Sequence, residues 1–323
     1  MKYQVGIPLA APARLSVLAA RHGGTVDESA GDLTISVVSP LESAGEGQLA
    51  PLTSGRYLAL ARQSPAALLV DAALAQRCPP GRRWVHSHAS WALAGVLADA
   101  FGDGEPDADG PIPDLRGGAY VSAGAHVAKD ATIAPFAVVM AGAVVGPRTF
   151  VEPHAVIYPR VRLGQRVRVG ASSVVGRPGF GWASGPDGSV RRIPQLAGVV
   201  VEDDVEIGPL VTVDAGTLAP TVLGRGVRLD AHVHVGHNVQ MGAGTIVAAQ
   251  SGFAGSVRVG RGVLVGGQVG VADHVTIGER ARLAAKAGVI GDVASGAVVA
   301  GYPAVDRARW LRGIARMLRL GAR

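Results

Sequence analysis

The 323-residue sequence has few of the residues that form disulfide frameworks or membrane spans. Its single cysteine, Cys78, excludes a disulfide framework within the chain and fits a reducing compartment. No stretch of 18 apolar residues occurs, which argues against a membrane-spanning helix. Arg14 and Arg21 interrupt the apolar run near the N-terminus, so this region is a poor secretory signal. We therefore expect a cytoplasmic protein with at most peripheral membrane contact.

Aromatic residues are also scarce, at 4% of the chain, although 48% of the residues are apolar. The 46 glycines are about twice the average usage. A chain of this kind fills its core with aliphatic side chains and turns often. The net charge of +6 fits either an acidic partner or a solvated basic surface. Basic residues interleaved with aromatics are absent, so we expect no binding to nucleic acid.

The N-terminal segment, residues 1–105, is typical of an α/β domain. The pattern predicts a helix at 15–20, a buried strand at 66–70 and a helix at 90–101. A Gly- and Pro-rich stretch at 102–111 then marks a domain boundary.

The second segment, residues 111–305, repeats with a period of six. An aliphatic residue falls at ten consecutive sixth positions from Val121 to Val175, and the period resumes after a break. Three hexapeptides make one triangular coil whose aliphatic residues point inward and stack on the next coil. The segment is similar to known hexapeptide-repeat proteins, and this resemblance implies a left-handed parallel β-helix. Loops are expected to leave the coil at 177–198 and 217–222, where the period slips.

The third segment, residues 306–323, is predicted to be a basic amphipathic helix. Trp310, Leu311 and Ile314 have helical spacing. Five arginines accompany them: Arg307, Arg309, Arg312, Arg316 and Arg319.

Histidines gather in the later repeats, and His237 and His274 are the best candidates for chemistry. Both fall just after an inward residue, so each is expected at a corner, pointing outward along one edge. A neutral imidazole can accept the proton of an amine during acyl transfer near pH 7. Gly255, 18 residues after His237, could offer a backbone N–H to an oxyanion. Asp230 could orient the imidazole of His237.

Three other interpretations of these histidines remain open. Corner histidines can simply hydrogen-bond the backbone of a turn, and the whole protein could be a structural trimer. His232 and His237 also have a spacing compatible with the zinc site of γ-class carbonic anhydrases, although no histidine lies between His154 and His232 to supply the third ligand.

Several motifs together resemble the UDP-3-O-(3-hydroxyacyl)glucosamine N-acyltransferases of lipid A biosynthesis, over nearly the whole chain. In order they are Gly179-Phe180-Gly181-Trp182-Ala183, Ile193-Pro194-Gln195, Asp203-Asp204-Val205-Glu206-Ile207-Gly208, Val213-Asp214-Ala215-Gly216, Val235-Gly236-His237-Asn238-Val239, Ala254-Gly255-Ser256 and Asp273-His274-Val275. The hexapeptides alone are not specific, whereas the loop and the His-Asn motif in this order are.

This resemblance implies a homotrimer with an N-terminal uridine-binding domain, a left-handed β-helix and a C-terminal helix. It implies transfer of a 3-hydroxyacyl chain from acyl carrier protein to the 2-amine of UDP-3-O-acyl-glucosamine, without a metal or a dissociable cofactor. His237 matches the general base, Gly255 the oxyanion amide and His274 a second active-site histidine. Four residues at or near the family's substrate-binding positions are expected to bind the substrate here: Ser54, Tyr57, Phe180 and Asn238. We expect the helix arginines to bind the carrier protein.

The sequence departs from the family at the nucleotide end. The family's Phe-x-x-Asn-x-x-Tyr is Pro51-x-x-Ser54-x-x-Tyr57 here, the Asp before Gly-Phe-Gly is Pro178, and Asp-Arg-Gly is Asp214-Ala215-Gly216. Either other residues compensate, or the enzyme acylates a different nucleotide-linked amino sugar, for example with an acetyl group from acetyl-CoA.

Overall fold

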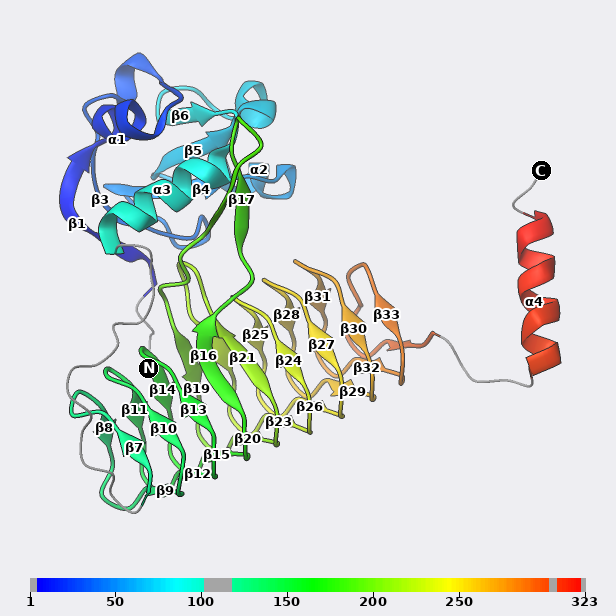
Figure 1. The fold of residues 1–323 in the computed structure, drawn as a ribbon. Helices are drawn as coiled ribbons and strands as arrows, with labels where there is room; N and C mark the ends of the chain where they lie inside the picture. The colour runs from blue at the N-terminus through cyan, green and yellow to red at the C-terminus, as the bar shows by residue number, and fades with distance from the viewer. Residues whose placement is uncertain (1–4, 102–117, 302–306, 321–323) are drawn as a thin grey trace.

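The computed structural model describes residues 5–101, 118–301 and 307–320 (Figure 1). The domain boundaries predicted at 105–111 and at 306 lie outside the described residues. No helix among the described residues is long and apolar enough to cross a membrane.

The N-terminal domain is built on one six-stranded mixed sheet in the order β1-β3-β4-β5-β6-β2. Its strands are β1 (Ile7–Arg14), β2 (Thr25–Val26), β3 (Thr34–Val38), β4 (Gln48–Leu52), β5 (Ala67–Asp71) and β6 (Arg83–His86). Its helices are α1 (Leu15–His22), α2 (Leu58–Ala61) and α3 (Ala89–Phe101), with short 3-10 turns at Glu28–Ala30, Gly55–Tyr57 and Ala72–Arg77. The predicted helices at 15–20 and 90–101 and the strand at 66–70 are confirmed as α1, α3 and β5.

The second domain is a parallel β-helix with three sheet faces, which confirms the predicted fold class, a left-handed β-helix between an α/β domain and a C-terminal helix. The first face holds β7 (Tyr120–Val121), β10 (Val138–Val139), β13 (Val156–Ile157), β16 (Val174–Pro178), β21 (Thr212–Ala215), β24 (His234–Val235), β27 (Gly252–Phe253), β30 (Gly270–Val271) and β33 (Gly288–Val289). The second face holds β8 (His126–Val127), β11 (Val144–Val145), β14 (Val161–Leu163), β19 (Val199–Val201), β22 (Thr221–Leu223), β25 (Gln240–Met241), β28 (Arg258–Val259) and β31 (Thr276–Ile277). The third face holds β9 (Thr132–Ile133), β12 (Phe150–Val151), β15 (Arg168–Val169), β20 (Glu206–Ile207), β23 (Arg228–Leu229), β26 (Ile246–Val247), β29 (Leu264–Val265), β32 (Arg282–Leu283) and β34 (Val298–Val299).

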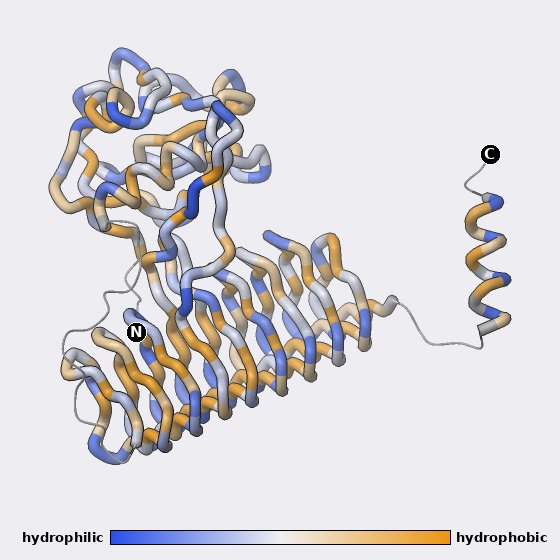
Figure 2. The backbone as a smooth tube through the Cα atoms, viewed as in Figure 1, coloured by the Kyte–Doolittle hydropathy of each residue, from blue (hydrophilic) through white to orange (hydrophobic). Residues whose placement is uncertain are grey.

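The aliphatic period predicts the core of this helix. Residues of the six-residue series from Val139 to Val289 are buried and form one continuous cluster, while Val121, Val127 and Ile133 at the first coil are partly buried. Register follows the expected 18-residue coil, as in the pairing of Val235 with Phe253. Figure 2 shows hydrophobic positions recurring in every coil.

Both predicted loops leave the coil. After β16 the chain forms a hairpin of β17 (Trp182–Ser184) and β18 (Val190–Arg192), which rises from the β-helix to α3 of the N-terminal domain (Figure 1). There the guanidinium of Arg191 lies 3.4 Å from the ring centroid of Trp91, a cation–π contact. The second excursion, at residues 216–220, joins β21 to β22.

The C-terminal helix α4 (Arg307–Leu320) confirms the predicted helix over its described residues and stands apart from the β-helix in Figure 1. Hydrophobic and hydrophilic positions alternate along it (Figure 2). Leu311, Met317 and Leu318 are 44–66% exposed in the single chain.

A substitution of Phe253, the largest fully buried side chain of the β-helix core, measures how much packing between coils contributes to stability. Phe253 is fully buried, and Phe253→Ala is expected to lower the free energy of unfolding by about 3–5 kcal/mol because it leaves a cavity between coils. Phe136 on the same helix is 65% exposed, so the same change there is expected to cost about 1 kcal/mol or less. Denaturant titrations of both variants measure the difference, and equal losses would contradict this description of the core.

Candidate active site

His237 lies at the corner where the chain turns from the first face to the second. β24 ends at Val235, the corner spans residues 236–239, and β25 begins at Gln240. Asn238 adopts a φ of 62°, a left-handed conformation that asparagine tolerates better than most residues. The backbone turns here while Val235 and Val239 stay buried, so the side chain of His237 projects from the corner, as the period predicts.

Glycines above and below make room for the imidazole. A methyl group at position 255 would lie 2.5 Å from Cε1 and 2.6 Å from Nε2 of His237, and one at position 179 would lie 2.7 Å from its Cβ. The ring is therefore packed between Gly179, where the chain leaves β16 for the hairpin, and Gly255, one coil beyond His237. A side chain at either position would displace it.

Asn238 determines which nitrogen of His237 can act as a base. Its Oδ1 accepts a hydrogen bond from the backbone N–H of Thr217 (3.2 Å), and its Nδ2 donates to the carbonyl of Ala219 (2.9 Å). These two partners assign the amide orientation. Oδ1 lies 3.0 Å from Nδ1 of His237, and an amide oxygen only accepts, so Nδ1 carries the proton of the neutral imidazole. The lone pair is then on Nε2.

A chain of hydrogen bonds connects this corner to the base of the hairpin. The hydroxyl of Thr217 lies 2.9 Å from Asn238 Oδ1 and 2.8 Å from Oε1 of the buried Gln195. Gln195 in turn donates to the carbonyl of Ile193 (2.9 Å), which directly follows β18. The hairpin that contacts the N-terminal domain is thus tied to the residue that orients His237.

His274 lies along the same edge, as predicted, with one coil between it and His237. The carbonyl of His237 accepts from Ser256 N–H (2.8 Å), and the carbonyl of Gly255 accepts from His274 N–H (3.0 Å). Tyr57 of the N-terminal domain brings its hydroxyl to 3.1 Å from Nδ1 of His274. His237, Gly255 and His274 therefore follow one another along this edge, and Tyr57 of the N-terminal domain contacts it at His274.

Arg56 fastens the N-terminal domain to this edge. It hydrogen-bonds the carbonyl of His274 and forms an ion pair of 3.0 Å with Asp292. Asp292 also accepts from the N–H of Thr276 (2.7 Å). The pKa of Asp292 is lowered, first by this backbone bond and then by Arg56.

Asp230 requires a correction to the expected geometry. It follows β23, at the corner that precedes β24, and its two oxygens accept from the N–H groups of Ala231 (2.7 Å) and Ala249 (3.2 Å). Within one chain it therefore binds turn backbone instead of orienting His237. Asn238 occupies the orienting position because it is in the same corner as the imidazole.

The remaining predicted residues lie in the N-terminal domain, at the foot of the hairpin and on α4. Ser54 caps the turn before Tyr57, with its hydroxyl accepting from Arg56 N–H at 3.4 Å. Phe180 is 81% exposed at the foot of the hairpin, edge-on to Trp182. Arg309, Arg312, Arg316 and Arg319 are exposed on α4, whereas the side chains of Arg307 and Trp310 lie outside the described residues.

Asp214, which the sequence motifs included but did not mark as a site residue, is a buried carboxylate one coil from His237. Asp214 is 1% exposed, and its Oδ1 lies 3.0 Å from Nε of Arg177. Its Oδ2 lies 3.8 Å from Nε2 of His234, whose Nδ1 is 2.7 Å from the hydroxyl of Thr212. Burial raises the pKa of Asp214, while the charges of Arg177, His234 and His237 oppose that rise. An acidic residue immediately after the inward Val213 was the available signal.

The histidine spacing that suggested zinc does not form a site in one chain. His232 lies at the corner that follows β23 and His237 at the next corner. Among the described residues, no three His, Cys, Asp or Glu side chains gather closely enough to hold a metal ion.

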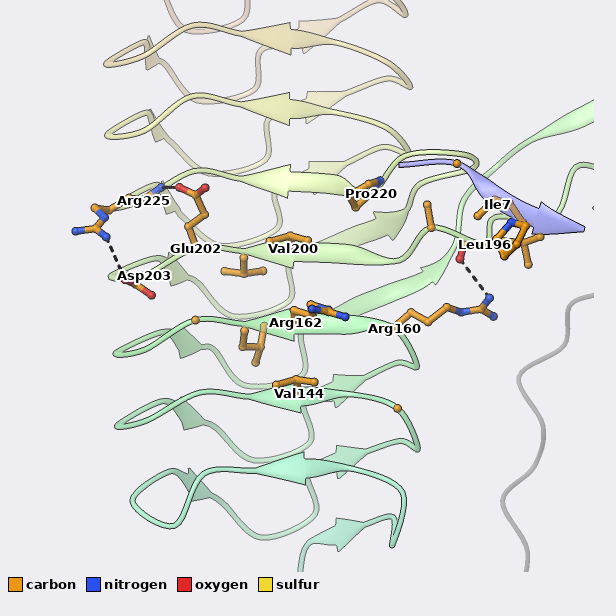
Figure 3. A pocket seen from close by; sticks show the side chains of 17 residues that line it. Ile7, Val144, Arg160, Arg162, Leu196, Val200, Glu202, Asp203, Pro220 and Arg225 are labelled. Carbon is orange, nitrogen blue, oxygen red and sulfur yellow. Dashed lines mark hydrogen bonds and ion pairs between the residues drawn. The ribbon is translucent and has the colours of Figure 1, made fainter. Parts of the chain in front are cut away.

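A pocket lies elsewhere, on the second face beside β1. It has a volume of about 930 Å³, and Figure 3 shows Val144, Arg162 and Val200 on its floor with Ile7 and Leu196 at one end. None of the predicted site residues lines it. The corner of His237 is an open edge of the single chain.

Comparisons with known proteins agree with this fold. The family model "Bacterial transferase hexapeptide (six repeats)" matches residues 142–177. A Caulobacter sp. (strain K31) protein named UDP-3-O-acylglucosamine N-acyltransferase is 38% identical over 319 residues, covering 95% of this chain and 94% of that protein. A Myxococcus xanthus protein of the same name is 57% identical over 149 residues, covering 45% of this chain and 43% of that protein.

Other matches are shorter or structural. Three further relatives of that name are matched over 24% of their own length. Among solved structures, the UDP-N-acetylglucosamine acyltransferase from Campylobacter jejuni has a TM-score of 0.53 and 25% identity, covering 62% of this chain and 77% of that chain.

The tautomer of His237 is directly measurable. In the wild-type protein, ¹⁵N NMR of labelled histidine is expected to show the neutral imidazole of His237 protonated at Nδ1. Asn238→Ala removes the acceptor, so the Nε2–H form is expected to become substantially populated. Gln240→Ala is the matched control, because Gln240 donates to Pro220 of the same loop. An unchanged tautomer in Asn238→Ala would show that another group orients the ring.

Proposed function

Because the chain belongs to the family of UDP-3-O-acylglucosamine N-acyltransferases, we propose that it moves a 3-hydroxyacyl chain from acyl carrier protein to the 2-amine of a UDP-linked, 3-O-acylated glucosamine. The observation that carries the proposal is the corner of His237, where an imidazole with a basic Nε2 projects from a glycine-lined edge. The phosphopantetheine arrives on the carrier protein, and no other cofactor takes part.

In the proposed reaction His237 is the general base. Nε2 takes a proton from the attacking amine as the amine nitrogen bonds to the thioester carbonyl carbon. The carbonyl oxygen becomes an oxyanion, which the backbone N–H of Gly255 stabilises. As the tetrahedral intermediate collapses, the C–S bond breaks and the imidazolium returns its proton to the leaving thiolate. The products are an amide and the free thiol of the carrier.

The other residues of the edge are proposed to bind the sugar nucleotide. Tyr57 and His274 already share a hydrogen bond, so a ligand between the N-terminal domain and the β-helix would contact both. Ser54 precedes Tyr57 in the same turn, and Phe180 offers an exposed ring near Gly179. Pro51 is in β4 and contributes no aromatic ring, so Tyr57 is the aromatic residue left to stack on uracil.

The assembly and location are part of the same proposal. An open edge with a catalytic corner is completed when a second copy packs beside it, as in the trimers that hexapeptide proteins form. The single cysteine, Cys78, is buried and burial raises the pKa of its thiol, which keeps it unreactive and fits the cytoplasm.

The substrate assay and one substitution test the reaction. Purified protein is incubated with 3-hydroxyacyl carrier thioesters and UDP-linked amino sugars, and amide formation is measured. His237→Ala is expected to lower kcat by about 10²–10⁴ while sedimentation shows the wild-type oligomer, since the side chain is outside the core. His126→Ala, an exposed histidine of the first coil, serves as the control. Turnover near the wild-type rate in His237→Ala would refute its role as base.

The basic face of α4 is proposed to dock the acidic carrier protein. Arg309, Arg312, Arg316 and Arg319 are spaced by three or four residues and so share one face. Leu311, Ile314 and Leu318 fall on another. Attraction of this kind acts mainly on the association rate and weakens with salt.

Charge reversal on that face separates docking from chemistry. The triple change of Arg312, Arg316 and Arg319 to Glu is expected to raise KM for the carrier thioester about tenfold or more and to flatten its salt dependence. Turnover of a free pantetheine thioester is expected to stay unchanged. Equal losses with both substrates would make the helix structural, and no loss with either would place docking elsewhere.

A further inference from the structure

The strand register places an ion pair between the buried Asp214 and the partly exposed Arg177 beneath the proposed catalytic corner. β16 pairs with β21 so that Arg177 lies opposite Asp214, and β21 pairs with β24 so that Val213 lies opposite Val235. Asp214 is therefore one coil away from Gly236 and next to the position of His237. Three neighbours place positive or titratable groups toward it: Arg177 from β16, His234 from β24 and His237 from the corner.

This carboxylate is held by few hydrogen bonds. Its side chain is 1% exposed, and the Arg177 contact at 3.0 Å is an ion pair whose angle leaves Oδ1 without a well-aligned donor among the described residues. Burying a carboxylate without donors favours its neutral form. The charge on Asp214 thus depends on Arg177, whose own side chain is 42% exposed.

Arg177 supplies the positive charge beside Asp214, because the next residue in the chain, Ala215, has none. The related pattern Asp-Arg-Gly has an arginine directly after the aspartate, where this chain has Ala215, and Ala215 is buried. The cation comes here from the adjacent coil, because Arg177 and Asp214 are partners in the strand ladder.

We infer that Arg177 is a positioning residue that keeps Asp214 ionised beneath His234 and His237, so that its negative charge stabilises the imidazolium formed when His237 takes the amine proton. This inference rests on the proposed function. Neither residue touches the substrate in this role. Asp214 acts through His237, and Arg177 acts through Asp214.

The sign of the effect follows from the charges. Without the carboxylate, the protonated form of His237 is less stable, so the neutral base persists to lower pH. The acidic limb of the kcat/KM profile is then expected to move to lower pH by roughly 0.5–1 unit in Asp214→Asn. Its plateau is expected to fall, because a weaker base accepts the amine proton less readily.

The variants of Arg177 distinguish this role from packing. Arg177→Gln removes the cation, and burial then raises the pKa of Asp214 further, so the group becomes neutral. Its profile is expected to shift in the same direction as that of Asp214→Asn, and the double variant is expected to shift no further. Arg177→Lys keeps the charge and is expected to retain the wild-type profile. Arg166→Gln, which breaks the exposed ion pair with Asp204, is the control.

An infrared measurement checks the same inference without turnover. The difference spectrum between each protein and its Asp214→Asn counterpart reports the carboxyl of Asp214. An ionised carboxylate is expected at pH 7 in the wild type and in Arg177→Lys, and a protonated carboxyl in Arg177→Gln. If the wild type shows no acyl transfer but this pattern holds, the proposed function fails and the ion-pair role stands.

Opposite results overturn the inference. A protonated Asp214 in the wild type would do so, as would an unshifted pH profile in Arg177→Gln with an intact fold. Additive shifts in the double variant would mean that Arg177 acts independently of Asp214. Because Arg177 is partly exposed, its variants are expected to fold even if Asp214→Asn does not.

Discussion

The stacking of each coil on the next, at a register of 18 residues, is the constraint on which the rest of the structure depends. Inward aliphatic residues form one continuous core, and parallel backbone hydrogen bonds fix the spacing between coils. Residues a coil apart are therefore held at strand-to-strand distance. Such closeness requires glycine at position 255, and the start of the hairpin brings Gly179 equally near, so a side chain at either position would collide with the imidazole of His237. A site built on this ladder has little freedom to move.

The hydrogen bonds around His237 extend this rigidity away from the corner. Asn238 orients the ring, and Thr217 and Gln195 join Asn238 to the hairpin that contacts α3. On the other side, Arg56 and Tyr57 attach the N-terminal domain to His274 and Asp292. The two attachments place the N-terminal domain against the same edge as the imidazole. The residues proposed to bind substrate and the proposed base thereby lie along one line of corners.

The charged groups along this line of corners differ in how deeply they are buried. Asp214 is buried beneath the corner, and this burial raises its pKa, while the charges of Arg177, His234 and His237 oppose the rise. Arg56 and Asp292, by contrast, are substantially exposed and contribute mainly to the geometry of the contact. On α4, Arg309, Arg312, Arg316 and Arg319 are exposed, so their proposed effect on a partner is long-range attraction. The same residue types thus act differently according to their burial.

The sequence by itself determined the β-helix, its aliphatic core, the two excursions and the corner positions of His237 and His274. A strict six-residue period admits few structures, and a residue's offset from the inward position settles which way it points. The tertiary structure alone decided which side chains meet. Asp230 and His237 are seven residues apart yet occupy successive corners, whereas Arg177 and Asp214 are 37 positions apart and lie side by side. The hairpin inserted between β16 and β19 changes the sequence distance between coils, so no fixed spacing could reveal that pair. Orientation of the imidazole by Asn238 likewise depends on Thr217 and Ala219, which a second excursion brings to the corner.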